Sequence, residues 1–95
     1  MEYLNKHGVY YYVYKSDDDL RKLAIKYNTT EKLIFLENNT AEFLEGQIIK
    51  ITRRSGKLYI VRPFETLEIL EKKFNVLLGE KNKINFVYPF QMILI

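Results

Sequence analysis

An internal repeat is the feature that most restricts what this chain can fold into. The stretch YYVYKSDDDLRKLAIKYN begins at Tyr11, and the similar stretch YIVRPFETLEILEKKFN begins at Tyr59. A constant shift of 47 positions places Tyr12 on Tyr59, and a shift of 44 then places GQIIKI, from Gly46, on FQMILI, from Phe90. Because one register holds over several segments and resumes after a single deletion, the chain contains two copies of a unit of about 45 residues.

The composition allows each copy to form a small folded unit. Hydrophobic residues make up 47% of the chain and aromatic residues 15%, so disorder is not expected and large rings can enlarge a small core. There is no cysteine, which excludes disulfides and zinc–thiolate sites. The run Asp17-Asp18-Asp19 lacks the alternating oxygens and turn glycine of a calcium loop, so it predicts a helix cap rather than a metal site. We expect no metal and no other cofactor.

The first copy predicts a strand, two helices and a second strand. Residues 11–14 are aromatic and β-branched, which is typical of a strand, and residues 48–51 form a second apolar run. From Leu20 the apolar residues follow helical spacing, and Asn28-Thr29-Thr30 separates this helix from the next. The helical apolar positions are Leu20, Leu23, Ala24 and Tyr27 in the first helix, and Leu33, Ile34 and Leu36 in the second.

The second copy predicts the same order of elements, with strands at residues 58–61 and 92–95 and helices at 67–74 and near 77–83. The fold class expected is α+β: two tandem βααβ units, each a two-stranded antiparallel sheet with two helices on one face. The expected boundaries are an N-terminal extension at 1–9, a first repeat at 10–51, a linker at 52–57 and a shortened second repeat at 58–95. The expected core residues are Leu20, Leu23, Leu33 and Ile49 in the first unit, and Leu67, Leu70, Phe74 and Ile93 in the second.

Both copies resemble the LysM (lysin motif) family in the order and spacing of their motif residues. The family pattern is roughly Y-x-V-x-x-G-D-T-L-x-x-I-A-x-K-F-N-V, followed by an Asn and then by Y-P-G-Q-x-L-x-I. The first copy is similar to it at Tyr12-Val13-Tyr14, Asp18-Asp19-Leu20, Leu23-Ala24, Lys26-Tyr27-Asn28, Asn38, Gly46-Gln47, Ile49 and Ile51. The second copy is similar to it at Tyr59-Ile60-Val61, Glu65-Thr66-Leu67, Leu70, Lys73-Phe74-Asn75-Val76, Tyr88-Pro89-Phe90-Gln91, Ile93 and Ile95.

The resemblance implies a βααβ fold and non-catalytic binding of N-acetylglucosamine-containing polymers such as peptidoglycan or chitin. The implied site is a shallow groove between the loop after the first strand and the loop before the second. These loops are residues 16–20 and 38–46 in the first copy, and 63–67 and 84–90 in the second. The glycan-binding residues expected are Asp18, Asp19, Leu20, Asn39, Leu44 and Gly46 in the first copy, and Thr66, Leu67 and Tyr88 in the second.

Two phenylalanines of the second copy, Phe64 and Phe90, stand where the family pattern has glycine. Glycine lets a backbone approach a sugar and adopt unusual dihedral angles, which phenylalanine does not do freely. The two rings either form an exposed apolar patch that suits a protein partner, or pack on one another. We therefore expect the first copy to carry most of the glycan affinity. The alternative is a protein-interaction or assembly module, as LysM-like domains are in spore-coat and phage-tail complexes.

Charge and motif content argue against other functions. Residues 1–51 carry a net charge of −1 and residues 52–95 a net charge of +4, with Arg53, Arg54 and Lys57 in the connector. No continuous basic face follows from this pattern, so we expect a solvated linker and no nucleic-acid partner. The sequence has no nucleophile motif near its single histidine and no sign of two carboxylates opposed across a cleft, so we expect no catalytic residue and no enzyme.

No segment approaches the roughly 20 apolar residues of a membrane span, and the first ten residues lack an apolar run of signal-peptide length. These features favour a cytoplasmic or assembly-associated location, unless the chain is part of a longer exported parent. The abundance of Lys, Asn and Ile is typical of an AT-rich bacterial or phage genome.

Overall fold

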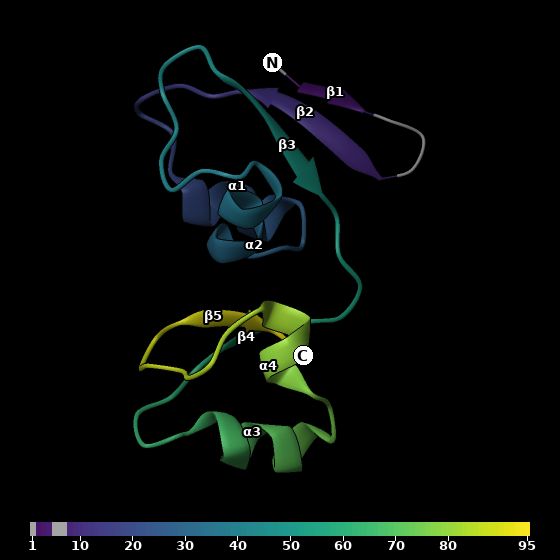
Figure 1. The fold of residues 1–95 in the computed structure, drawn as a ribbon, viewed down its shortest axis with the longest axis vertical. Coiled ribbons are helices and arrows are strands. Elements are labelled where there is room, and N and C mark those ends of the chain that lie inside the picture. The colour runs from purple at the N-terminus through teal and green to yellow at the C-terminus, as the bar shows by residue number, and fades with distance from the viewer. Residues whose placement is uncertain (1, 5–7) are drawn as a thin grey trace. The chain divides into compact units, whose positions relative to one another are not determined.

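The computed structural model describes residues 2–4 and 8–95 and divides into two compact units, Met1–Arg54 and Ser55–Ile95 (Figure 1). The first unit contains β1 (Glu2–Leu4), β2 (Val9–Val13), α1 (Leu20–Lys26), α2 (Glu31–Glu37) and β3 (Ile48–Thr52). The second unit contains β4 (Leu58–Ile60), α3 (Leu67–Phe74), α4 (Leu78–Asn82) and β5 (Met92–Leu94). The order strand–helix–helix–strand occurs in both units, which confirms the predicted α+β fold class.

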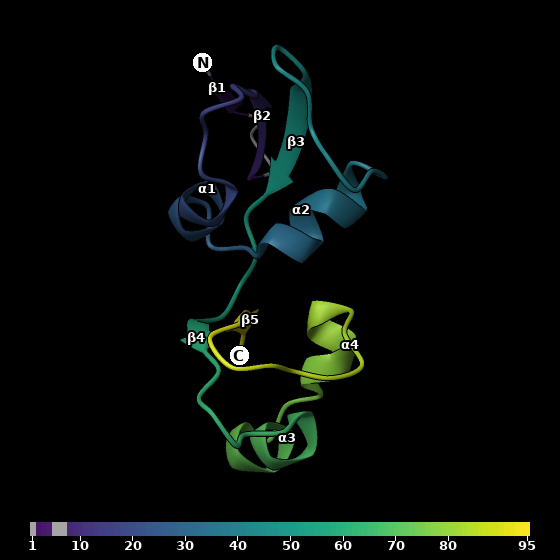
Figure 2. The same cartoon turned by 90° about the vertical axis from the view of Figure 1, so that its left-hand side faces the viewer.

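The strands that enclose the helices pair in the same way in both units. β2 is antiparallel to β3 with Tyr12 opposite Ile49, and β4 is antiparallel to β5 with Tyr59 opposite Ile93. These pairs are equivalent under the repeat shifts, so the two copies share one strand register. Within the first unit, α1 and α2 lie next to each other against the sheet (Figure 2).

The first sheet has one strand more than the sequence predicts. β1 pairs antiparallel with the free edge of β2, so the strand order is β1-β2-β3. The sequence predicts only an extension at residues 1–9, because three residues are too few to show an alternating pattern. The strand conformation of β1 arises from main-chain hydrogen bonds to β2, which the sequence of the segment does not encode locally.

Side-chain hydrogen bonds start three of the helices. Asp19 accepts hydrogen bonds from the N–H groups at the start of α1, Thr30 does so for α2, and Thr66 does so for α3. These groups have no partner within the helix, so capping stabilises each first turn. None of the helices in the described residues is long and apolar enough to cross a membrane.

The predicted core residues lie inside their units to different degrees. Leu33, Ile49, Leu70 and Ile93 are buried, as expected. Leu20 and Leu23 are half-buried, as are Leu67 and Phe74, which pack against the core cluster of the second unit. That cluster consists of Val61, Leu70, Leu78, Ile84 and Ile93.

The prediction that Leu36 belongs to the apolar face of the second helix is wrong. Leu36 is 52% exposed, whereas Leu33 and Ile34 are buried. A residue two positions after Ile34 lies about 200° further round the helix, so it points away from the face that Leu33 and Ile34 bury. In α1, Ala24 is the fully buried residue, and Tyr27 is buried directly after the helix, where its ring contacts Tyr10 at 4.5 Å between centroids.

One asparagine in each unit joins the second helix to the last strand. Asn82 Nδ2 donates to the carbonyl oxygens of Leu78 and Leu94, at 3.1 and 2.8 Å, and Leu94 N donates to Asn82 Oδ1 at 2.8 Å. Asn38 makes the equivalent bonds to Ile34 and Lys50 in the first unit, at 2.7–2.8 Å. The asparagine side chain thus bonds to the outer edge of β3 or β5, where a neighbouring strand would otherwise bond.

We expect Asn82→Ala to lower the free energy of unfolding by about 2–4 kcal/mol, because it leaves the buried main-chain groups of Leu94 without partners. The measurement is urea unfolding followed by circular dichroism. Asn85→Ala is the matched control, since Asn85 is exposed in the loop that follows; it should change stability by less than about 0.5 kcal/mol. Equal effects of the two substitutions would contradict a structural role for Asn82.

Candidate functional site

The loop after the first strand is closed in both units by a tyrosine and a carboxylate. Tyr12 Oη donates to Asp18 Oδ1 at 3.0 Å, and Lys15 N donates to Asp18 Oδ2 at 2.8 Å. In the second unit Tyr59 Oη lies 2.7 Å from both carboxylate oxygens of Glu65, and Arg62 N donates to Glu65 Oε1 at 2.7 Å. The carboxylate of Asp18, which the sequence predicts to bind glycan, therefore has partners within its own loop.

Two further predicted glycan-binding residues have structural partners. Asp19 Oδ1 accepts from Arg21 N at 3.0 Å and from Lys22 N at 3.3 Å, while Thr66 Oγ1 accepts from Ile69 N at 3.2 Å. The side chains of Asp19 and Thr66 thus cap α1 and α3, although both residues remain exposed to solvent. Leu20 and Leu67, the first residues of these helices, are half-buried.

The loop before the last strand ends in a tight turn and a bulge. Gln47 N donates to Leu44 O at 3.0 Å, which closes the turn, and Gln47 Oε1 accepts from Leu44 N at 3.0 Å. Gly46 N and Gln47 O both bond to the main chain of Tyr14, at 2.8 Å. Gly46 and Gln47 thus both lie opposite Tyr14. The first of them, Gly46, has φ +82°, a backbone conformation that favours glycine.

The second unit builds the same turn with phenylalanine at the glycine position. Gln91 N donates to Tyr88 O at 3.2 Å, Phe90 N donates to Val61 O at 2.7 Å, and Val61 N donates to Gln91 O at 2.9 Å. Phe90 therefore takes a φ of 68°, and Phe64 in the other loop takes a φ of 72°. A bulky residue in this left-handed region is strained, because its Cβ crowds its own backbone.

The two phenylalanines do not pack on one another. Phe64 is 97% exposed, so its ring meets almost no other atom of the chain, and Phe90 is 65% exposed. Of the two arrangements that the sequence left open, the structure has exposed rings. Phe86 and Tyr88 are also exposed, with ring centroids 6.5 Å apart. Four large aromatic rings are therefore accessible on the two loops of the second unit.

In the first unit the two site loops are joined directly. Ser16 N donates to Glu45 Oε1 at 2.6 Å, and this hydrogen bond from the main chain lowers the pKa of the Glu45 carboxyl. Phe43 anchors the second loop through ring contacts with Tyr14, at 5.6 Å, and Phe35, at 4.9 Å between centroids. The structure therefore brings Ser16 of the first loop and Glu45 of the second loop into direct contact.

Besides Asp19, whose side chain caps α1, the predicted residues of the first unit that are exposed are Asn39, Leu44 and Gly46. Leu44 is 67% exposed, and the space around the Cα of Gly46 is open, since an added Cβ would meet nothing within 4 Å. Asn39 is exposed and has φ 55°, in the left-handed region. In the second unit Tyr88 is accessible, at 55% exposure.

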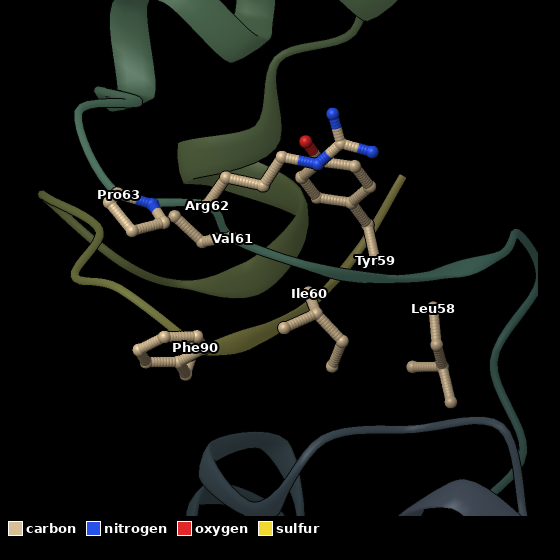
Figure 3. Close-up of a pocket in the computed structure, with 7 residues that line it drawn as sticks. All are labelled: Leu58, Tyr59, Ile60, Val61, Arg62, Pro63 and Phe90. Atoms are coloured by element: carbon tan, nitrogen blue, oxygen red, sulfur yellow. The ribbon is translucent and has the colours of Figure 1, made fainter.

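A shallow groove of about 370 Å³ lies along β4 of the second unit. Its lining consists of the consecutive residues Leu58 to Pro63 together with Phe90 (Figure 3). Leu58, Ile60 and Phe90 project to one side of β4, while Tyr59 and Arg62 project to the other (Figure 3). None of the nine glycan-binding residues predicted from the sequence lines this groove, but Phe90, the predicted protein-contact residue, does.

Sequence reasoning missed several residues that shape the loops. Tyr12 and Tyr59 each precede their carboxylate partner by six positions. This equal spacing in the two copies was a usable signal for the pair. Glu45 and Asn82 gave no comparable signal, because their partners are main-chain groups 29 and 12 residues away.

Comparison with known proteins finds no family and only a partial likeness to solved structures. No family model matches the chain, and no curated protein matches it. The chain is similar to the crystal structure of the spore cortex-lytic enzyme SleL of Bacillus cereus, with 21% identity over 93% of this chain and a TM-score of 0.43. For SleL of Bacillus megaterium QM B1551 the identity is 22% over 90% of this chain, and the TM-score is 0.46. The chain spans 22% of the length of either enzyme, and no residue role is transferred from so low a similarity.

We expect the stability of the second unit to depend on the ionisation of Glu65. The hydrogen bond from Arg62 N and that from Tyr59 lower the pKa of Glu65 in the folded state. As the pH falls below about 5, Glu65 is therefore protonated in the unfolded chain before it is protonated in the folded chain. The stabilisation that ionised Glu65 provides to the folded state is lost as the pH falls through the folded-state pKa. Acid unfolding of Glu65→Gln should be less steep than that of the wild type. Glu68→Gln is the control, because its ion pair with Lys72 is almost fully exposed; the same change in both variants would contradict this assignment.

We expect Phe64→Gly to raise the free energy of unfolding by about 0.5–1 kcal/mol. Glycine relieves a left-handed strain of about 1–2 kcal/mol, although its larger backbone entropy in the unfolded chain offsets part of the gain. Thermal and urea unfolding measure the effect. Phe86→Gly is the matched control: Phe86 is also exposed but has no positive φ, so this change should destabilise. A loss of stability in Phe64→Gly would show that the Phe64 ring contributes to the fold.

Proposed function

We propose that the chain is a non-catalytic binding module of two LysM-like units, and that it binds an N-acetylglucosamine-containing glycan such as peptidoglycan or a chitin-like oligomer. The observation that carries this proposal is the hydrogen bond between Ser16 N and Glu45, at 2.6 Å. It joins the two loops that form the sugar groove in the family that the sequence resembles. The loops are thus organised without a ligand, which reduces the entropy lost on binding.

The first unit offers the chemistry that an N-acetyl sugar requires. The main-chain N–H groups of Phe43 and Glu45 donate to no other group in the described part of the chain, so they are available to a ligand. Leu44 supplies an exposed apolar side chain beside them, and Gly46 leaves room for close approach. The donors, the apolar contact and the open backbone lie within four consecutive residues, which suits a shallow site with weak individual contacts.

Tandem units would strengthen such weak binding. When two modules on one chain engage the same polymer, the second binding step occurs at a high effective concentration. The Tyr–carboxylate pair and the turn before the last strand are present in both units, so the second unit keeps the scaffold of the site. The exposed aromatic rings of the second unit alter the surface around these loops, but the hydrogen bonds named above are the same in both units.

The carboxylates of the second unit support a role without catalysis. Glu65 accepts hydrogen bonds from Tyr59, Glu68 pairs with Lys72 at 3.5 Å, and Glu71 Oε2 accepts from Gly79 N at 3.0 Å. A glycosidase needs two carboxyl groups that face the same bond of the substrate, one as acid and the other as base or nucleophile. Each of these three carboxylates instead has a partner within the unit, and those of Glu65 and Glu71 are hydrogen-bond donors that hold local structure.

A protein-interaction or assembly module is the second candidate, and the exposure of Phe64 favours it. A ring that is 97% exposed on a strained backbone contributes little to folding, so it is better suited to contact with another molecule. Exposed aromatic side chains are frequent anchors at protein interfaces. This function would reside in the second unit and is compatible with glycan binding by the first.

Titration with a tetramer of N-acetylglucosamine tests the proposal. In amide NMR spectra we expect the first shifts at residues 17–20 and 38–46. Leu44→Ala should weaken binding about threefold to tenfold, because it removes an apolar contact. Leu36→Ala is the matched control, since Leu36 is exposed to a similar degree on α2, outside the loops. Shifts concentrated at residues 63–67 and 84–90 would assign the glycan to the second unit. No shift at millimolar ligand would refute glycan binding and favour the protein-interaction function.

A further inference from the structure

The two units differ at one edge of their sheets. In the first unit, β1 pairs with the edge of β2 that faces away from β3. In the second unit, β4 takes the place of β2, and its sheet contains only β4 and β5 within the described residues. The edge of β4 that corresponds to the one covered by β1 therefore has no strand beside it.

The register shows which main-chain groups point outward from this edge. Lys57 and Ile95 exchange hydrogen bonds, at 3.2 and 2.8 Å, and Val61 bonds to the bulge beside β5. In an antiparallel pair, alternate residues bond to the neighbouring strand. The N–H and C=O groups of Leu58 and Ile60 consequently face away from β5, and nothing in the described part of the chain bonds to them.

Comparable positions on two other strand edges have partners. Tyr11 corresponds to Leu58 and lies opposite Tyr3 of β1. On the far side of the second sheet, Leu94 exchanges hydrogen bonds with the side chain of Asn82, at 2.8 Å. The chain therefore covers this edge in the first unit and the outer edge of β5, but it leaves the edge of β4 open.

The open edge borders the groove that runs along β4. Leu58, Ile60 and Phe90 project to one side of β4 and line the groove (Figure 3). Ile60 is 42% exposed and Phe90 is 65% exposed. Two cations flank the strand, since Lys57 precedes it directly and Arg62 follows two residues after its end, and both are exposed.

We propose that β4 binds an extended segment of a partner protein as an added antiparallel strand, a binding mode that is independent of glycan recognition. Main-chain hydrogen bonds to Leu58 and Ile60 would hold the segment in the way that β1 is held on β2. Alternate apolar side chains of the segment would enter the groove beside Ile60 and Phe90. Acidic residues at its two ends would face Lys57 and Arg62, so the segment is apolar at every second position and acidic at both ends.

A second copy of this chain is a poorer occupant. Antiparallel pairing of two β4 strands through Leu58 and Ile60 would place Lys57 of each copy close to Arg62 of the other. Like charges at such cross-strand positions are destabilising. Basic residues and a proline beside a short edge strand are common protections against self-association, and Lys57, Arg62 and Pro63 have these positions here.

The test uses the full labelled chain and one capped heptapeptide in which valine alternates with threonine and a glutamate stands at each end. We expect saturable amide shifts at Leu58 and Ile60. At about 90% occupancy their hydrogen exchange should slow about tenfold, while exchange at Tyr11 stays unchanged. The same peptide with its valines replaced by proline should not bind, because proline lacks the N–H groups needed for strand pairing.

Variants of the chain distinguish main-chain hydrogen bonding at the edge of β4 from contact between apolar side chains alone. Ile60→Pro removes an outward N–H without breaking a bond to β5, so it should abolish binding. If that variant does not fold, Leu58→Lys, which adds a charge at the edge, should weaken binding at least about tenfold. Ile69→Ala is the control, since Ile69 is exposed on α3 outside the groove, and it should bind as the wild type does.

Three results would overturn the proposal. The first is the absence of shifts at millimolar peptide. The second is a set of shifts confined to residues 84–90, which would indicate contact with the rings alone. The third is concentration-dependent dimerisation through Leu58 and Ile60 without peptide, which would identify a second copy as the occupant. None of these results bears on glycan binding, because the N-acetylglucosamine tetramer is absent from this experiment.

Discussion

In each unit the structure depends on one asparagine side chain that binds both a helix and a strand. Asn38 and Asn82 each bond to a carbonyl of the second helix and to both main-chain groups of one residue of the last strand, Lys50 or Leu94. An amide group has a donor and an acceptor side by side, so it can pair with a strand as a second strand would. This junction lies at the start of the loop that leads to the candidate site, and it closes one edge of the sheet. The free edge of the second unit is therefore the edge of the first strand.

The motif residues of the loops contribute mainly to their shape. Asp18 and Glu65 close the first loop by binding a tyrosine and a main-chain N–H, while Asp19 and Thr66 cap the helices that follow. Once these side chains are engaged, the groups left to meet a ligand are main-chain atoms and exposed apolar side chains. Under the proposed function, main-chain donors and apolar side chains would therefore recognise the N-acetyl group.

The two copies have kept one framework and changed their surfaces. The turn before the last strand requires a positive φ at its third residue, which Gly46 adopts without strain and Phe90 adopts at a cost. The first unit covers the edge of its first strand with β1, whereas the second leaves that edge without a neighbouring strand, beside the groove that Leu58, Ile60 and Phe90 line. Both changes expose apolar surface in the second unit. We therefore infer that the units have separate binding roles.

The sequence by itself determined the repeat, the order of the elements and part of the core, because these depend on local spacing. Helical periodicity identified α1 and α3, and the shifts of 47 and 44 predicted equivalent strand pairs. Only the tertiary structure decided which polar side chains remain free, since Asp18, Glu45 and Asn82 bind partners that the fold brings to them. It also decided the position of β1, which has no periodicity of its own, and the exposure of Phe64, because a single ring is buried or exposed only according to what packs around it.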